Sequence, residues 1–125
     1  IDPEHLSEET LIHYPVDRRR LDIFERFLQP HGIEPSATRE TELTLMMIQL
    51  VASGRGVACL PNWALQAYLD AGLIAVRPLG KNGVWPVLYA AIRKEQSGTQ
   101  YLKDFVNTAA ESSFATLKGI AKAEG

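Results

Sequence analysis

The sequence predicts an α/β fold in which a mainly parallel sheet is flanked by helices on both faces. Short apolar segments alternate with stretches of helical spacing along the 125 residues, and parallel crossovers place such helices on the two faces of a sheet. The composition is 46% hydrophobic and 22% charged, which is typical of a globular domain that buries its own core.

The first part of the chain predicts a strand, a helix and a second strand. Residues 11–14 form a short apolar strand that Pro15 closes. Asp17 is placed to cap a helix from Arg18 to about Gln29, because the apolar residues of this segment fall within one arc of a helical wheel. Residues 37–41 then predict the second strand.

The central segment, residues 39–61, predicts a helix, a glycine turn and a buried strand. We expect the helix to open at Thr41 and Glu42, since a hydroxyl can cap free N–H groups and a carboxylate favours the positive first turn. Apolar residues then cover nearly the whole helix circumference. Gly54 and Gly56 predict the turn, and residues 57–60 the strand.

The second half of the chain continues the alternation. Residues 63–71 predict a helix, and residues 73–76 and 84–93 predict two further strands. Residues 99–118 keep helical spacing throughout. The tail after Gly119 is expected to fray.

Several kinds of site are disfavoured by the sequence. Gly54-Arg55-Gly56 follows a helix and precedes a strand, which reverses the order of a dinucleotide-binding fingerprint. No histidine has a partner at metal-ligand spacing, and no nucleophile motif occurs, so we expect neither a metal nor a catalytic residue. Cys59 lies in an apolar run and predicts an inert buried thiol in a reducing cytoplasm. The net charge of -2 argues against nucleic-acid binding by this piece alone.

A ligand edge is predicted where the parallel strands end, because ligands of such sheets bind beyond the carboxyl ends of the strands. Tyr14, Thr41 and Pro61 follow three successive strands. Simple capping fully explains Thr41 and Glu42 and is slightly favoured, and ligand binding is the alternative interpretation. In the second interpretation the helix N-terminus accepts a carboxylate and Glu42 accepts an ammonium, the two charges of an amino acid.

The central helix also predicts an interface with another chain. It is apolar on more sides than a sheet can cover, so Met46, Met47 and Leu50 are expected to meet a second copy.

Three segments carry a resemblance to a known family. The segment LVASGRGVACLPNWAL, together with LYAAIRK further on, resembles the effector-binding domain of LysR-type transcriptional regulators. The earlier segment HYPVDRRRLDIFERFLQPHGIEP is similar, more narrowly, to the members that regulate methionine biosynthesis. The resemblance spans about residues 3–118.

The resemblance implies a type II periplasmic-binding-protein-like fold of two lobes. Residues 1–94 would be the second lobe, and residues 95–125 would hold the C-terminal helix that normally returns to the first lobe. A DNA-binding winged helix-turn-helix and most of the first lobe would be absent from this chain. Family members form dimers or tetramers and bind a small effector between the lobes, which in the narrower group is homocysteine.

By position, the predicted edge residues would face the effector cleft. Other LysR-type regulators often carry a small hydroxyl residue where this chain has Glu42, and a carboxylate there suits an amino-acid effector. The resemblance implies a regulatory protein without catalysis or cofactor. The alternatives are a solute-binding domain of a transport system with the same fold, and a small α/β enzyme domain.

The C-terminal helix leads to one further expectation. Its apolar stripe would lack its usual partner lobe, so we expect the helix to dock elsewhere on its own domain or on a second chain. The stripe consists of Leu102, Phe105, Val106 and Ala109.

Overall fold

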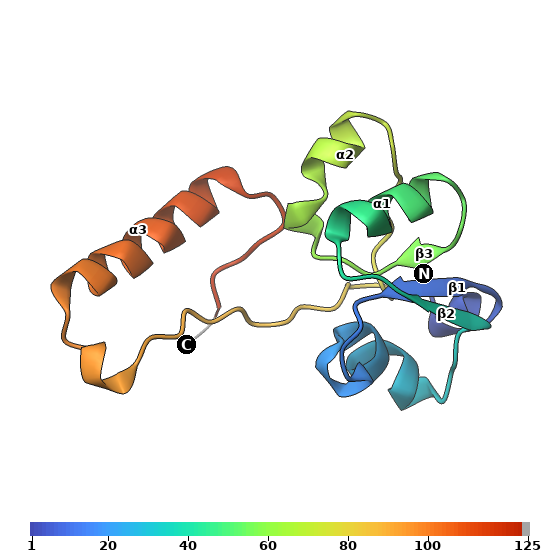
Figure 1. Cartoon of the computed structure of the whole chain (residues 1–125), viewed down its shortest axis with the longest axis horizontal. Coiled ribbons are helices and arrows are strands. Elements are labelled where there is room, and N and C mark those ends of the chain that lie inside the picture. Colours follow the sequence, from blue (N-terminus) through green and yellow to red (C-terminus); the bar gives the residue numbers. More distant parts are fainter. Residues whose placement is uncertain (124–125) are drawn as a thin grey trace.

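The computed structural model describes residues 1–123 and contains a three-stranded sheet in the order β2-β1-β3 (Figure 1). The central strand pairs in parallel with both neighbours, so that Leu11 lies opposite Thr38 on one side and opposite Val57 on the other. The predicted α/β fold with a mainly parallel sheet is therefore confirmed. The strands are β1 (Thr10–His13), β2 (Ala37–Glu40) and β3 (Val57–Ala58).

Within residues 1–123, three α-helices and several shorter helical segments precede, connect or follow the strands. The α-helices are α1 (Thr44–Ala52), α2 (Gln66–Asp70) and α3 (Gln100–Thr116). The 3₁₀ helices are Pro3–Glu8, Arg18–Arg20, Gln29–His31, Asn62–Ala64 and Lys94–Gln96, and the one π-helix of the described residues is Ile23–Leu28.

Helices cover both faces of the sheet, as the alternation in the sequence predicts. Successive residues of a strand point to opposite faces. Leu11 packs into one cluster with Phe24 and Leu28 from the helical segments that follow β1. On the other side of the sheet lies α1, whose Ile48 is 1% exposed (Figure 1). β1 is thus a central strand with residues buried on both faces.

The helix predicted over residues 18–29 is wrong as a single element. Asp17 does cap its start, because its side chain accepts a hydrogen bond from the backbone N–H of Arg19 at 2.9 Å. The segment then becomes extended at Leu21 before it continues as the π-helix. This break lets the π-helix bury all its apolar side chains: Ile23, Phe24, Phe27 and Leu28.

The helix predicted to open at Thr41 and Glu42 begins later, at Thr44. The backbone N–H of Thr41 donates to the carbonyl oxygen of His13 at 3.0 Å, so residue 41 still belongs to the β1–β2 ladder. Leu43 takes the N-cap position and its side chain caps nothing. The capping role expected of Thr41 and Glu42 is therefore wrong for α1.

The strands predicted over residues 73–76 and 84–93 are also wrong. Leu79 and Val84 still pack on the core cluster, and the chain then leaves the sheet as an extended segment (Figure 1). Leu88 is 87% exposed. A strand needs a neighbouring backbone to complete its hydrogen bonds, and the described residues place none beside this segment.

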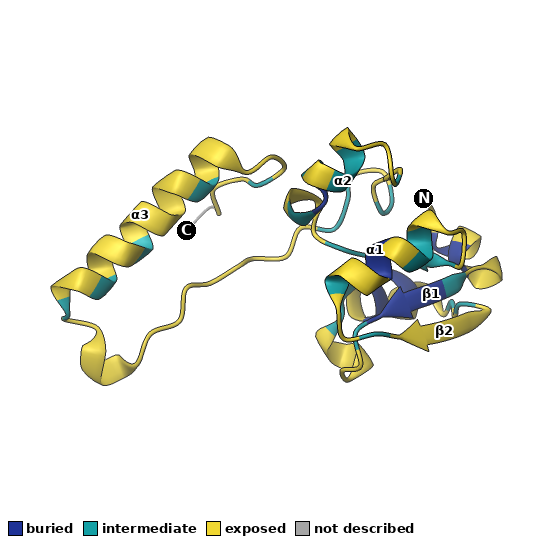
Figure 2. Ribbon diagram, turned by 45° about the horizontal axis from the view of Figure 1, so that its top comes forward, coloured by how far each residue is buried: buried dark blue, intermediate teal, exposed yellow. Residues whose placement is uncertain are grey.

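We call residues 85–116 the arm, and residues before them the body. The arm contains α3, which lies within the predicted range 99–118, and none of its residues is buried (Figure 2). Phe105 is 69% exposed. Of the two docking sites expected for α3, its own domain is wrong, because only the extended segment of the arm lies along the helix, and docking on a second chain stays a prediction. Of the tail expected to fray, residues 124 and 125 lie outside the described residues.

Candidate functional site

The carboxyl ends of the parallel strands form one edge of the sheet, which we call the effector edge. Tyr14 directly follows β1, and Thr41 directly follows β2 and is bonded to β1 through His13. Pro61 comes shortly after β3, beyond the same edge. The topology thus brings together the three segments that the sequence places at the ligand edge.

A pair of hydroxyl groups joins β1 to α1 at this edge. The phenol oxygen of Tyr14 lies 2.6 Å from Oγ1 of Thr44, the first residue of α1. The sequence analysis did not single out Thr44 as a site residue. The available signal was its position as the hydroxyl residue just before the continuous apolar run.

The N-terminus of α1 opens onto the same edge. The first N–H groups of a helix have no acceptor within the helix and carry its positive dipole end. Because the side chain of Leu43 cannot cap them, these donors remain available to an anion. Glu42 lies exposed between β2 and this helix end, and it takes part in none of the ion pairs of residues 1–123.

His13 is buried beside the effector edge and contacts its backbone. It is 6% exposed, its Nδ1 lies 2.7 Å from the carbonyl oxygen of Tyr14, and its ring packs edge-on to Phe24 with 5.3 Å between centroids. This contact lies on the face opposite α1. His13 therefore fixes the backbone at Tyr14 and does not line the edge itself.

Cys59 follows β3 and is half-buried. Burial raises the pKa of its thiol to about 11, and the nearby negative charge of Asp22 adds to this shift. Since the thiolate is the reactive form, this environment favours the inert thiol that the apolar run predicts.

The residues predicted to meet a second copy differ in exposure. Met46 is 50% exposed and Leu50 is half-buried, so both reach the surface of α1. Met47 is 1% exposed and packs in the core of the body. The structure therefore corrects the expected interface at Met47, because its side chain is already covered by its own chain.

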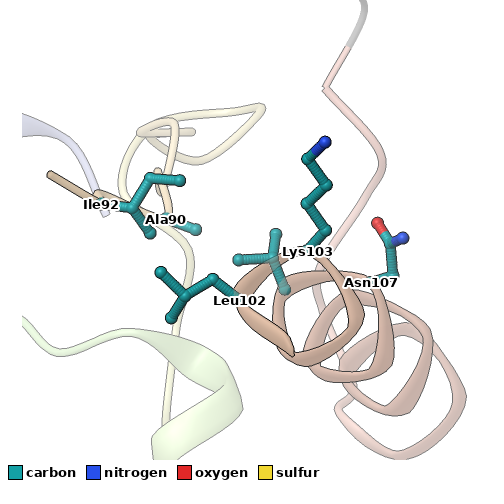
Figure 3. A pocket seen from close by; sticks show the side chains of 6 residues that line it. Ala90, Ile92, Leu102, Lys103 and Asn107 are labelled. Atoms are coloured by element: carbon teal, nitrogen blue, oxygen red, sulfur yellow. The ribbon is translucent and has the colours of Figure 1, made fainter. Parts of the chain in front are cut away.

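Two hollows lie away from the effector edge. The larger, about 300 Å³, separates α3 from the extended segment of the arm, and Leu102 extends across it toward Ala90 and Ile92 (Figure 3). The smaller, about 190 Å³, lies between Arg18 and the end of the π-helix. Neither contains an edge residue.

Two further kinds of feature do not occur in the described part of the chain. Among residues 1–123, no three His, Cys, Asp or Glu side chains are grouped so that they could hold a metal ion. No helix of this part combines the length and the hydropathy needed to cross a membrane.

Comparisons with known proteins agree with the resemblance seen in the sequence. Residues 1–113 match the family model of the LysR substrate binding domain. The HTH-type transcriptional regulator MetR of Haemophilus influenzae is 45% identical over 119 residues, and that of Escherichia coli K12 is 39% identical over 124 residues. The regulatory domain of MetR from N. meningitidis, described as a LysR family regulator, superimposes with a TM-score of 0.88 at 41% identity.

The extent of these matches also matters for their interpretation. They cover 95% and 99% of this chain for the two sequence relatives, and 98% for the solved structure. The chain spans only 38% of the length of each of these relatives and 56% of the solved regulatory domain. The similarity therefore concerns one part of a longer kind of protein.

Proposed function

The chain belongs to the LysR substrate-binding domain family, and on that premise we propose that it is the effector-sensing part of a transcriptional regulator. The effector we propose is homocysteine, and the regulated genes are those of methionine biosynthesis. The relatives described above are named as regulators, which favours this role over a transport-associated solute-binding domain or an enzyme. The protein would act in the cytoplasm and need no resident cofactor.

One observation carries the proposal, namely the uncapped N-terminus of α1 beside the Tyr14–Thr44 hydroxyl pair. An amino-acid effector has a carboxylate that helix N–H groups bind well. It also has an ammonium group, for which Glu42 is a nearby exposed carboxylate that takes part in no ion pair of the described residues. Pro61 would complete the edge on the β3 side.

We propose that signalling follows from closure of the cleft around the effector. A ligand that binds the closed form more tightly shifts the population toward it. The change would reach DNA through a separate DNA-binding domain and through the geometry of a homo-oligomer. The exposed surface of α1, with Met46 and Leu50, is the part of this chain that we assign to the oligomer contact.

Calorimetry on the full-length protein tests the proposal, with homocysteine as ligand and methionine as the comparison. We expect Glu42→Gln to weaken homocysteine binding by about 10- to 100-fold, because a charge-assisted hydrogen bond contributes about 1.5–3 kcal/mol. Glu111→Gln, an exposed carboxylate of α3, is the matched control and should leave the affinity unchanged. Equal affinities for wild type and Glu42→Gln would refute the pairing of Glu42 with the ammonium.

A further inference from the structure

The N-cap position of α1 is occupied by a residue type that is poorly suited to it. Leu43 lies there and its side chain caps nothing, whereas serine, threonine, aspartate and asparagine are the residues that stabilise a helix start. Burial within this chain does not compensate, because Leu43 is 66% exposed. A residue that breaks a local rule in this way is expected at a functional site. The choice of leucine at this position therefore calls for a functional reason.

Leu43 is held among the groups proposed to bind the two charges of the effector. Its carbonyl oxygen accepts the backbone N–H of Met47 at 3.0 Å, a bond that ties residue 43 to the first turn of α1. Glu42 precedes it, and Thr44 with the free N–H groups of the helix follows it. The side chain of an amino acid branches from the carbon that carries both charged groups. In the proposed binding mode it therefore starts close to Leu43.

The segment after β3 brings a second apolar residue to the same edge. Trp63 is 40% exposed and belongs to the 3₁₀ helix Asn62–Ala64, where Oδ1 of Asn62 accepts its backbone N–H at 2.9 Å. Figure 1 and Figure 2 both show this short segment, between β3 and α2, beside the start of α1. We call Leu43 and Trp63 the apolar border of the effector edge.

The chemistry of the apolar border favours sulfur over oxygen in the ligand. The side chain of Leu43 offers no hydrogen bond, and burying a hydroxyl group without a partner is unfavourable. A thiol is a weak donor and acceptor and loses less, and sulfur makes favourable contacts with aromatic rings. We propose that Leu43 and Trp63 are specificity-determining residues that select an amino acid with a sulfur-bearing side chain over its oxygen analogue. This inference rests on the proposed function for the binding of the two charges.

Calorimetry on the full-length protein with homocysteine and homoserine tests the proposal, because these ligands differ in a single sulfur or oxygen atom. The wild type should bind homoserine about 10- to 100-fold more weakly than homocysteine. Leu43→Ala removes the apolar wall and still leaves the helix uncapped, so it should reduce this selectivity ratio by at least about fivefold. Leu73→Ala, at an exposed leucine beyond α2, is the matched control and should leave the ratio unchanged.

Trp63→Leu tests the second residue of the border by itself. The variant keeps an apolar side chain and removes the aromatic ring. Homocysteine should therefore bind about two- to tenfold more weakly, as expected for the loss of a contact between sulfur and an aromatic ring. The affinity for homoserine should change by less than about twofold, since its oxygen makes no such contact. An equal loss of affinity for both ligands would exclude Trp63 as a determinant of specificity.

The selectivity ratio separates this inference from a packing role and from the proposed function. If Leu43 only packs against the first lobe of the full-length protein, Leu43→Ala lowers both affinities by the same factor. The unchanged ratio then overturns the inference, and the proposed function stands. If the wild type binds homoserine as tightly as homocysteine, the inference is overturned as well, although the site is shown to bind an amino acid. If the wild type binds neither ligand, the proposed function falls and the inference falls with it.

Discussion

The body and the arm contain similar proportions of apolar residues but use them differently. In the body, Leu11, Ile12 and Leu28 are each 1% exposed. In the arm, Tyr101 and Phe105 are 65% and 69% exposed, and no residue of the arm is buried (Figure 2). Because burial of apolar area is the main stabilising term in folding, the body supplies its own stability, whereas the arm leaves its apolar side chains exposed. Apolar periodicity alone does not distinguish these two uses.

Two side-chain truncations test this comparison, and they are expected to give the largest difference in stability. Leu28→Ala should lower the free energy of unfolding by about 2–5 kcal/mol, since it leaves a cavity in a fully packed core. Phe105→Ala in the arm should change it by less than about 0.5 kcal/mol, as expected of a surface substitution. Urea titrations of this 125-residue chain measure both values.

The same titrations could also show that the body and the arm do not differ in this way. A loss of more than about 1 kcal/mol for Phe105→Ala, well above the surface range, would mean that α3 packs on the body in solution. Leu102→Ala, on the half-buried side of α3, would then be the matched second truncation and should show a similar loss.

An intermediate effect is expected from glycine substitutions. At Gly56, with φ +148°, an added Cβ would lie 2.5 Å from the backbone oxygen of Thr10, so Gly56→Ala strains the sheet and should cost about 1–3 kcal/mol. Gly98→Ala, within the arm just before α3, has open space around it and should cost nothing measurable. Thermal unfolding compares the two variants, and a destabilisation at Gly98 equal to that at Gly56 would contradict the distinction.

The smallest effect on stability is expected from an exposed ion pair on the surface of the body. Arg19 hydrogen-bonds the Asp17 carboxylate through its side chain and its backbone N–H, and these bonds lower the pKa of Asp17 to about 2. Because the pKa of Asp17 is lower in the folded state, the ionised carboxylate stabilises the fold at pH values above the unfolded pKa of 3.8. This stabilisation is lost as the pH falls toward 2.

Asp17→Asn should therefore lower stability slightly at neutral pH, and the difference from wild type should shrink between pH 4 and pH 2. Urea midpoints measured across this range give the result. Glu111→Asn on α3 is the control. If the stability difference between Asp17→Asn and wild type stays constant with pH, the pairing of Asp17 with Arg19 is not the cause of that difference.

Much of the fold follows from local patterns in the sequence. β1, β2 and α3 lie where apolar spacing and turn residues predict them, and for the two strands the partner strands that complete their hydrogen bonds are present. The segment 84–93 has the composition of a strand yet forms none in the described residues. The composition of a segment indicates that it is suited to form a strand. It does not indicate whether a neighbouring strand is present to pair with it.

The effector edge was predictable in position but not in detail. Parallel pairing brings Tyr14 and Thr41 to one edge, a consequence of topology alone. The start of α1 depends on a single long-range hydrogen bond from Thr41 to His13, which local sequence cannot show. The role of Thr44 depends on tertiary structure in the same way.

The strand order has a consequence for biosynthesis. Of the three strands, β1 leaves the ribosome first, yet it lies in the centre of the sheet and pairs with β3 as well as β2. Non-local pairing of this kind is slow, since a long loop must close first. In the nascent chain the apolar strand β1 therefore lacks its partner β3 until synthesis has passed Ala58. Chaperones can bind β1 during that interval.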